Sequence, residues 1–406
     1  MNVLVLTYWS YTDALIQTYT LPYVRIMKKH IDGKIFLVML EPSIKRLTID
    51  EYSAITEKLS KEGIIPVFLK YHSSFVLSAI SWLLYFPKLL KIISANNIGT
   101  IHAWCTPAGA IGAVIRTFNK KLELNIDSYE PHAEAMVENG TWSNTGLKYK
   151  VLSRFEKMEA KYADNLIFAA PGMQNYIKDK YDVAIEKYQV KPACVDLDAF
   201  SDKMLKDSKL MQQFGFNDKI VCVYAGKFGG IYLTDETFQF IKKCQDHWGL
   251  ERFRFLLLSN IDDAYVKQMA MKYQIDESVI VKLFIPHSEI AKYMGLADFA
   301  ICPVKPVPSK KYCSPVKNGE YWALGLPVVI TQNISVDSDI IASNNAGAVI
   351  EALNEEGYIN AVEKIDSIIS NNNRAEVYAK IRPLAEKYRN FTIAENVYKA
   401  IYASLG

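Results

Sequence analysis

The stretch SPVKNGEYWALGLPVVI, residues 314–330, decides the fold of this 406-residue chain. It predicts a short helix followed by a buried strand at 327–330. Lys317 and Glu320 stand three residues apart at the start of that helix, so their side chains share one face. A helix N-terminus beside a parallel strand is where α/β folds hold phosphate groups. The stretch therefore predicts an anion site, and the alternative is an ordinary helix with a solvated Lys/Glu pair.

Strand-like apolar runs alternate with amphipathic, helix-like runs on both sides of this stretch. The expected strands lie at 2–8, 34–40, 64–69, 99–104, 122–127 and 165–170, and then at 219–225, 253–259, 279–285, 299–304, 327–331 and 346–350. Continuous apolar strands between helices predict parallel sheets that are covered on both faces. Two such series, separated by a polar stretch near 196–207, predict an α/β protein of two Rossmann-like, doubly wound domains.

Composition excludes several functional classes. The net charge is +3 and no dense basic block occurs, which argues against a nucleic-acid partner. The six cysteines form no Cys-x-x-Cys pair, so we expect reduced thiols, no zinc site and a cytoplasmic location. The opening residues MNVLVLT predict a strand, not a secretion signal. No apolar run reaches the roughly 18 residues that span a bilayer.

The 314–330 stretch resembles the nucleotide-sugar motif of GT-B glycosyltransferases. The pattern of the retaining family-4 type reads Ser-Pro-x-Lys-x-x-Glu-Tyr-x-Ala-x-Gly-x-Pro-Val-Val, and the chain follows it from Ser314 to Val329. Three further segments resemble the same family in the same order, at Phe155–Met173, Val190–Phe200 and Val223–Tyr232. Several weak motifs in the right order make the resemblance strong for the fold and good for the class of activity.

The resemblance implies the architecture of the whole chain. Residues 1–200 are expected to form a Rossmann-like acceptor domain. Residues 201–388 are expected to form the Rossmann-like nucleotide-sugar domain, and a terminal helix in 389–406 to pack back on the first domain.

The resemblance also implies the activity. We expect transfer of a sugar from a nucleoside diphosphate sugar to a glycan or lipid-linked acceptor, with retention at the anomeric carbon, in surface polysaccharide or glycolipid synthesis. No metal or other cofactor is implied. The expected location is cytoplasmic, with a peripheral contact on the inner membrane face.

Positive groups on the donor side are expected to stabilise the departing diphosphate. Lys317 is the first candidate and Lys227 the second. Gly229 and Gly230 form the loop in which the backbone can approach a phosphate. Glu320 is the expected ribose ligand, because a carboxylate can accept hydrogen bonds from two vicinal hydroxyls.

Further donor-side candidates are Ser314 and Pro315, which open the motif, and Tyr312, which precedes it. Here the chain departs from its relatives. Tyr312 stands where many of them have a Glu, which leaves the usual sugar contact and the donor sugar open. The basic residue usual after the Gly loop is also missing, and Ile231 and Tyr232 stand near its place.

Polar residues on the acceptor side follow the strand expected at 122–127. Asp127, Glu130 and His132 come where α/β sheets place ligands, and His132 is expected to hydrogen-bond the sugar or to move a proton near neutral pH. The alternative is a capped loop at a helix start. Tyr8 follows the first strand, where relatives carry a Gly-Gly turn, and is expected to stack on a sugar or to pack between domains.

The apolar run from Phe75 to Ile93 has two interpretations. One is a core helix. The other is a membrane-docking surface with exposed apolar side chains between basic ones. The residues concerned are Trp82, Leu83, Tyr85, Phe86, Lys88 and Lys91.

Two other functional classes remain open from the sequence. A nucleotide-sugar epimerase on the same fold would need acid/base carboxylates and no acceptor. A non-catalytic GT-B binding protein would account for Tyr312 in place of the usual Glu.

Overall fold

The chain divides into two compact units in a computed structural model. The structure describes residues 1–13, 15–42, 47–71 and 75–403. For residues 75–83 it describes the backbone but not the side chains. The first unit holds Met1–Val137, Trp142–Lys191 and the chain from Thr392 onward. The second holds Glu138–Thr141 and Pro192–Phe391.

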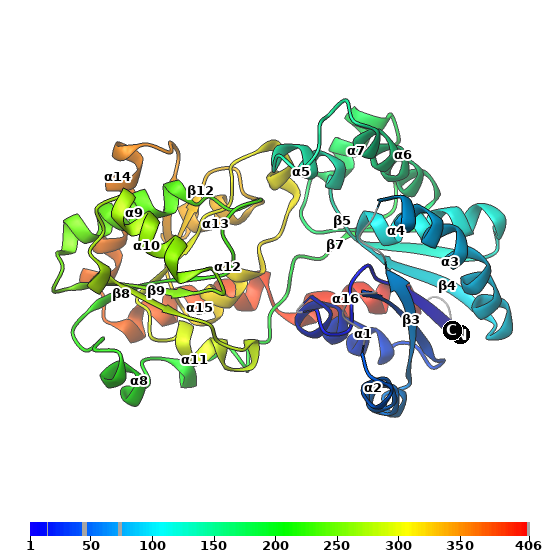
Figure 1. Ribbon diagram of the computed structural model, residues 1–406, viewed down its shortest axis with the longest axis horizontal. Coiled ribbons are helices and arrows are strands. Elements are labelled where there is room, and N and C mark those ends of the chain that lie inside the picture. The colour runs from blue at the N-terminus through cyan, green and yellow to red at the C-terminus, as the bar shows by residue number, and fades with distance from the viewer. Residues whose placement is uncertain (14, 43–46, 72–74, 404–406) are drawn as a thin grey trace. The chain divides into compact units, whose positions relative to one another are not determined.

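The first unit is built on a seven-stranded sheet of parallel strands in the order β3-β2-β1-β4-β5-β6-β7 (Figure 1). The strands are β1 Asn2–Leu6, β2 Ile35–Pro42, β3 Ile64–Tyr71, β4 Ile98–Trp104, β5 Glu123–Tyr129, β6 Asn165–Phe168 and β7 Tyr188–Val190. The order reverses direction beside β1, as in a doubly wound fold, and parallel strands end at a common edge where such folds bind ligands.

Helices connect these strands, and one helix returns from the far end of the chain. They are η1 Ile16–Thr20, α1 Leu21–Lys28, α2 Ile49–Lys61, α3 Phe75–Ala95, α4 Cys105–Phe118, α5 His132–Glu138, α6 Leu147–Tyr162, α7 Met173–Tyr181 and α16 Phe391–Tyr402. From Thr392 onward, α16 belongs to the first unit.

The second unit is built on a six-stranded parallel sheet in the order β10-β9-β8-β11-β12-β13. Its strands are β8 Ile220–Ala225, β9 Phe253–Leu258, β10 Ile280–Leu283, β11 Phe299–Cys302, β12 Val328–Thr331 and β13 Gly347–Ile350. Its helices are η2 Asp202–Met204, α8 Ser208–Gln213, α9 Asp235–Trp248, α10 Asp263–Lys272, η3 Glu277–Val279, η4 His287–Glu289, α11 Ile290–Met294, η5 Pro308–Tyr312, α12 Val316–Ala323, α13 Asp337–Ser343, α14 Glu355–Ser370 and α15 Arg374–Tyr388.

Apolar residues on both faces of the second sheet explain its continuous hydrophobic strands. Successive β8 side chains pack into opposite cores, with Val221 and Val223 in one and Cys222 and Tyr224 in the other. Side chains alternate between the faces of a strand, so a sheet covered by helices on both faces needs apolar residues at every position.

The predicted fold class is confirmed, and each of the twelve predicted strands has a counterpart. The structure has one strand more than predicted, β7, which is only three residues long and therefore carries too little periodic signal in the sequence. The six cysteines form no disulfide. No helix among the described residues is long and apolar enough to cross a membrane.

Candidate functional site

Lys317 projects from the first turn of α12 into a half-buried, aromatic environment. Its Nζ donates a hydrogen bond to the Tyr232 hydroxyl at 3.0 Å and lies 4.4 Å from the centre of that ring. Burial works to lower the pKa of the ammonium, but Tyr232, Cys302 and Glu320 outweigh it, so the pKa is raised above its ordinary value. A fixed positive charge therefore stands at the helix N-terminus, where the macrodipole also favours an anion.

Gly226, which follows β8, makes room for this lysine. A Cβ built at Gly226 would lie 2.6 Å from Lys317 Cε and 3.0 Å from Nζ. The φ angle of Gly226 is +152°, a conformation that side-chain-bearing residues rarely adopt. The Gly loop and the lysine of α12 are thus parts of one site, although 91 residues separate them in the sequence.

The Gly loop is fixed by backbone pairing with the segment after β11. Tyr232 forms isolated bridges with Gly229 and with Val304, and the Leu233 N–H donates to the Pro303 carbonyl at 2.8 Å. Gly229 and Gly230 are exposed, with φ of +78° and +61°. Their surface is open, because a Cβ at either position meets nothing within 4 Å.

Lys227 is exposed on the same loop. The Tyr224 hydroxyl donates to its carbonyl and so fixes the backbone beneath the side chain. Lys227 therefore offers an exposed positive charge on the Gly loop.

Tyr232 replaces the basic residue that relatives carry after the Gly loop. Its hydroxyl is bonded to the Lys317 ammonium. Lys317 matches the lysine of the family's own motif, so the missing basic residue has no replacement in it, and Tyr232 instead orients the Lys317 ammonium.

Glu320 lies one turn after Lys317 and is 8% exposed. Its Oε1 is 3.5 Å from Nε2 of His287, a residue of η4 whose side chain is half exposed. Sequence reasoning missed His287 because it belongs to a separate loop after β10, 33 residues earlier. The sequence gave one indication that His287 could belong to the site, because it follows the strand predicted at 279–285 and α/β sheets place ligands at strand ends.

Tyr321 and Arg374 hold α12 in place. The Tyr321 hydroxyl accepts a hydrogen bond from the Ala225 N–H at 3.1 Å, which ties the helix to the end of β8. Arg374 donates to the carbonyl of Gly325 at 2.8 Å and to that of Leu324, and so satisfies carbonyls that a helix C-terminus leaves unpaired.

Ser314 belongs to a buried polar network at the other end of α12. Its Oγ accepts from the Ala193 N–H at 2.9 Å and from Arg389 at 2.7 Å. Arg389 also pairs with Asp337, which accepts from Asn318 at 2.7 Å. Burial raises the pKa of Asp337 although Arg389 opposes the shift.

The residues around Ser314 frame the start of α12. Pro315 is the N-cap residue, and Tyr312 ends η5 and is half-buried. The proposed donor contacts of Tyr312, Ser314 and Pro315 stay predictions.

Asp127, at the end of β5, is fully buried. Lys191 Nζ lies 3.2 Å from its carboxylate, and Tyr398 of α16 donates to it at 2.8 Å. His102 lies 3.3 Å from Asp127 and 2.8 Å from the Tyr402 hydroxyl. Burial opposes ionisation, but Lys191 and His102 outweigh it and lower the pKa of Asp127 to about 2. The carboxylate has no surface left for a sugar, so we now propose a structural role for it.

His132 and Glu130 are half-buried where α5 begins. Helix α6 holds this loop, because the Tyr129 hydroxyl donates to the Glu156 carbonyl at 2.8 Å and the Ala133 N–H donates to Glu156 Oε1 at 2.7 Å. Their sugar-side role stays a prediction. Tyr8 is half-buried and packs edge-on against Tyr71 at 5.6 Å.

Tyr85, one of the residues considered for an exposed apolar surface on α3, is 5% exposed and donates to the Lys70 carbonyl, whereas its neighbour Leu84 is 67% exposed. The membrane-docking surface on α3 stays a prediction. The side chains of Trp82 and Leu83 lie outside the described residues. Phe86 is half-buried, while Lys88 and Lys91 are exposed as predicted.

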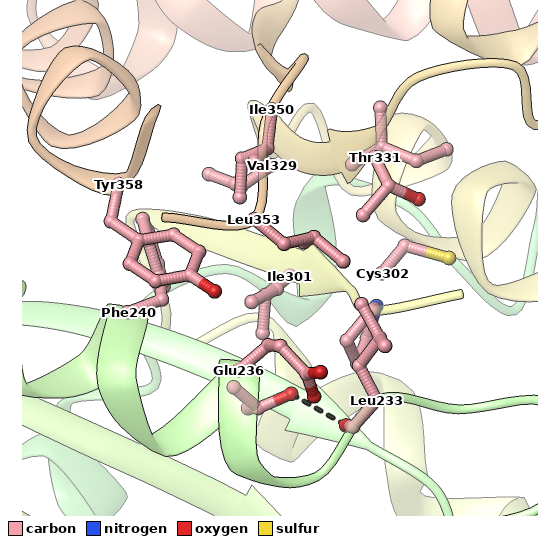
Figure 2. Close-up of a pocket in the computed structure, with 13 residues that line it drawn as sticks. Leu233, Glu236, Phe240, Ile301, Cys302, Val329, Thr331, Ile350, Leu353 and Tyr358 are labelled. Atoms are coloured by element: carbon pink, nitrogen blue, oxygen red, sulfur yellow. Dashed lines mark hydrogen bonds between the residues drawn. The ribbon is translucent and has the colours of Figure 1, made fainter. Parts of the chain in front are cut away.

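Figure 2 shows a pocket between the ends of β11, β12 and β13 and helices α9 and α14. Its lining is mostly apolar, and its volume is about 10 Å³. The Tyr358 hydroxyl is buried there without a hydrogen-bond partner among the described residues. The pocket suits one water molecule and is too small for a nucleotide.

Comparison with known proteins finds a family match in the second unit and a fold match over the whole chain. Residues 255–384 match the family model "Glycosyl transferases group 1". The match runs from β9 into α15 and includes Lys317 and Glu320. The two doubly wound sheets are those of GT-B structures. The chain has the GT-B fold, and its second unit matches a family of glycosyl transferases. No curated protein matches the chain in sequence.

Solved structures resemble the chain over its full length. A glycosyltransferase from Rickettsia africae is 13% identical, with a TM-score of 0.72 over 99% of this chain and 98% of that one. HepE from Anabaena, solved with UDP, is 13% identical, with a TM-score of 0.72 over 99% and 100%. WaaG, a glycosyltransferase involved in lipopolysaccharide biosynthesis, is 13% identical, with a TM-score of 0.70 over 99% of both chains. At this identity the likeness establishes the fold.

Proposed function

We propose that this glycosyltransferase moves a sugar from a nucleoside diphosphate sugar to a glycan or lipid-linked acceptor. The observation that carries the proposal is the Lys317 ammonium, held over Gly226 at the start of α12 with Glu320 one turn away. The structures of HepE with UDP and with UDP-glucose support a donor of this kind.

In the proposed reaction the anomeric C–O bond to the diphosphate breaks and a bond to the acceptor oxygen forms. Lys317 and N–H groups of the first turn of α12 stabilise the negative charge that develops on the leaving diphosphate. Lys227 adds a second positive charge from the Gly loop, and Glu320 accepts hydrogen bonds from the ribose hydroxyls.

We propose retention of configuration, with the leaving phosphate taking the proton of the acceptor hydroxyl on the same face of the sugar. No metal takes part in this scheme, because side-chain ammonium groups and helix N–H donors supply the positive charge. His132 and Glu130 are the proposed contacts on the sugar or acceptor side.

We propose surface polysaccharide or glycolipid synthesis at the cytoplasmic face of the membrane as the setting. The support is the likeness to WaaG, which is involved in lipopolysaccharide biosynthesis.

A thermal-shift screen against nucleoside diphosphates and their sugars tests the proposal first. A ligand that binds only the folded chain raises its apparent stability. The expected result is a selective shift by one diphosphate and its sugar, with slow release of free sugar when no acceptor is present. A complete lack of response would overturn the proposal, and conversion of the free nucleotide sugar into its epimer would identify an epimerase.

A further inference from the structure

The outward surface of α6 carries two parallel rows of side chains. Four exposed basic residues follow one another at helical spacing, and they are Lys150, Arg154, Lys157 and Lys161. Beside them runs an apolar row of Leu147, Val151 and Tyr162, whose exposed fractions are 67%, 43% and 41%. Residues separated by three, four, seven or eleven positions lie on one side of a helix, so both rows extend along its length.

Acidic side chains are missing from this outward surface because both glutamates of α6 point inward. Glu156 and Glu159 are fully buried. Within the described residues, Lys150, Arg154 and Lys157 form no ion pair, whereas Lys180 of α7 pairs with Glu134. The outward surface of α6 therefore carries an uncompensated positive field.

The same field continues where α6 ends. Helix α4 packs against α6 (Figure 1), and the two helix ends enclose a surface hollow of about 400 Å³. Arg116, Lys120 and Lys161 line it, with Asp164 as the one acid of the lining, 3.4 Å from Arg116. Three positive charges face one negative charge, so the hollow favours an anionic group.

We infer that this surface of α6 docks on a bilayer that contains anionic lipid. The basic row meets lipid phosphates, while Leu147, Val151 and Tyr162 enter the boundary between headgroups and acyl chains. A nucleic acid would engage the basic row but would leave the apolar row exposed to water. A membrane engages both at once, as surface-lying amphipathic helices do.

The inference deepens the proposed function, since a lipid-linked acceptor lies in such a bilayer. It adds a membrane contact on α6 to the one predicted on α3, and the sequence pattern did not single out α6. It does not depend on the donor chemistry, because α6 lies in the first unit and none of its exposed residues belongs to the proposed donor site.

Vesicle co-sedimentation of the full chain tests the inference. The wild type is expected to bind phosphatidylglycerol–phosphatidylcholine vesicles at low salt, to bind pure phosphatidylcholine vesicles much more weakly, and to lose most binding at high salt. Each cation near an anionic surface contributes about 1 kcal/mol, so Lys150→Gln, Arg154→Gln and Lys157→Gln together should lower the partition coefficient about 100-fold.

Two further variants separate the components. Leu147→Ser with Val151→Ser should weaken binding at low and high salt alike, because the apolar contribution is not screened. The matched control neutralises three exposed lysines of the second unit, with Lys203→Gln, Lys267→Gln and Lys364→Gln. It changes the net charge equally and should bind like the wild type.

Unchanged vesicle binding by the triple-glutamine variant of α6, an equal loss in the control, or binding of a short DNA duplex without vesicle binding would each overturn the inference. Far-UV circular dichroism and the nucleotide-induced thermal shift verify that each variant is folded. If the wild type binds vesicles but shows no thermal shift with any nucleotide, the proposed function is refuted and the membrane-docking inference is still supported.

Discussion

The Lys317 side chain lies directly over Gly226, so a side chain at position 226 and the observed position of the lysine cannot coexist. A methyl group at 226 would occupy the space of the lysine's last carbon, 2.6 Å away, and the backbone there has a φ of +152°. The charge of the site and the shape of the Gly loop therefore form a single structural requirement.

Gly226→Ala is expected to displace the Lys317 ammonium and to lower kcat at least tenfold, with a smaller change in KM. Steady-state sugar transfer or donor hydrolysis measures it. Gly249→Ala, after α9 and outside the Gly loop, is the matched control, since it also places a side chain at positive φ but meets nothing within 4 Å. Equal losses in both variants would mean that backbone strain, not the lysine, explains the effect.

Lys317→Ala should cost about 2–4 kcal/mol of transition-state stabilisation, by analogy with the loss of one oxyanion donor. The pKa of Lys317 is raised above its ordinary value of 10.5, so the ammonium stays protonated throughout neutral pH. We expect no titration of this group in the rate between about pH 6 and 9. Near-wild-type turnover of the variant would remove Lys317 from the mechanism.

Glu320→Gln is expected to weaken binding of the nucleoside diphosphate about tenfold, because a neutral amide accepts hydrogen bonds from the ribose less well. Calorimetric titration measures the affinity. His287→Gln leaves the carboxylate in place and removes its imidazole neighbour, so it should change the affinity less. An unaltered affinity in Glu320→Gln would contradict the ribose role.

Asp127→Asn should lower the free energy of unfolding by about 3–5 kcal/mol, because it leaves the Lys191 ammonium buried without its counter-charge. The folded-state pKa of Asp127 is about 2, below its ordinary 3.8, so this stabilisation is present above pH 3.8 and is lost as the pH falls toward 2. Urea unfolding across that range measures it. Glu57→Gln, which breaks the exposed pair with Lys61, should cost less than about 1 kcal/mol.

Glu156 should show the opposite pH dependence. Burial raises its pKa to about 7, so the folded state favours the protonated form. Its contribution is fully present below pH 4.5 and is lost as the pH rises through 7. Glu156→Gln should therefore gain stability relative to the wild type between pH 5 and 8, by up to about 3 kcal/mol. A melting-temperature difference that stays constant over this range would show that Glu156 does not titrate there.

The sequence predicted the sheets and the site helix well, because both leave periodic local signals. Continuous apolar runs at 219–225 and 253–259 predict strands covered on both faces, and they are β8 and β9. That Lys317 and Glu320 share one face of the helix follows from their separation of three residues alone.

Side-chain partners distant in the chain were beyond such reasoning. Tyr232 precedes Lys317 by 85 residues, and its hydroxyl has no periodic signature. Lys191 reads as a solvated lysine before Pro192, yet it is fully buried, with Nζ 3.8 Å from the centre of the Tyr23 ring. Tyr85 looked equally suited to core and surface, because apolar content alone does not say which side of a helix is covered.

The distance along the chain between Asp127 and its partner Tyr398 has a consequence for synthesis. A ribosome completes β5 long before it reaches α16, and every strand of the second unit is made in between. The nascent first unit must therefore wait with His102 and Asp127 lacking their tyrosine partners until nearly the whole polypeptide has emerged. The first unit therefore completes its folding late in synthesis, although most of its residues are synthesised first.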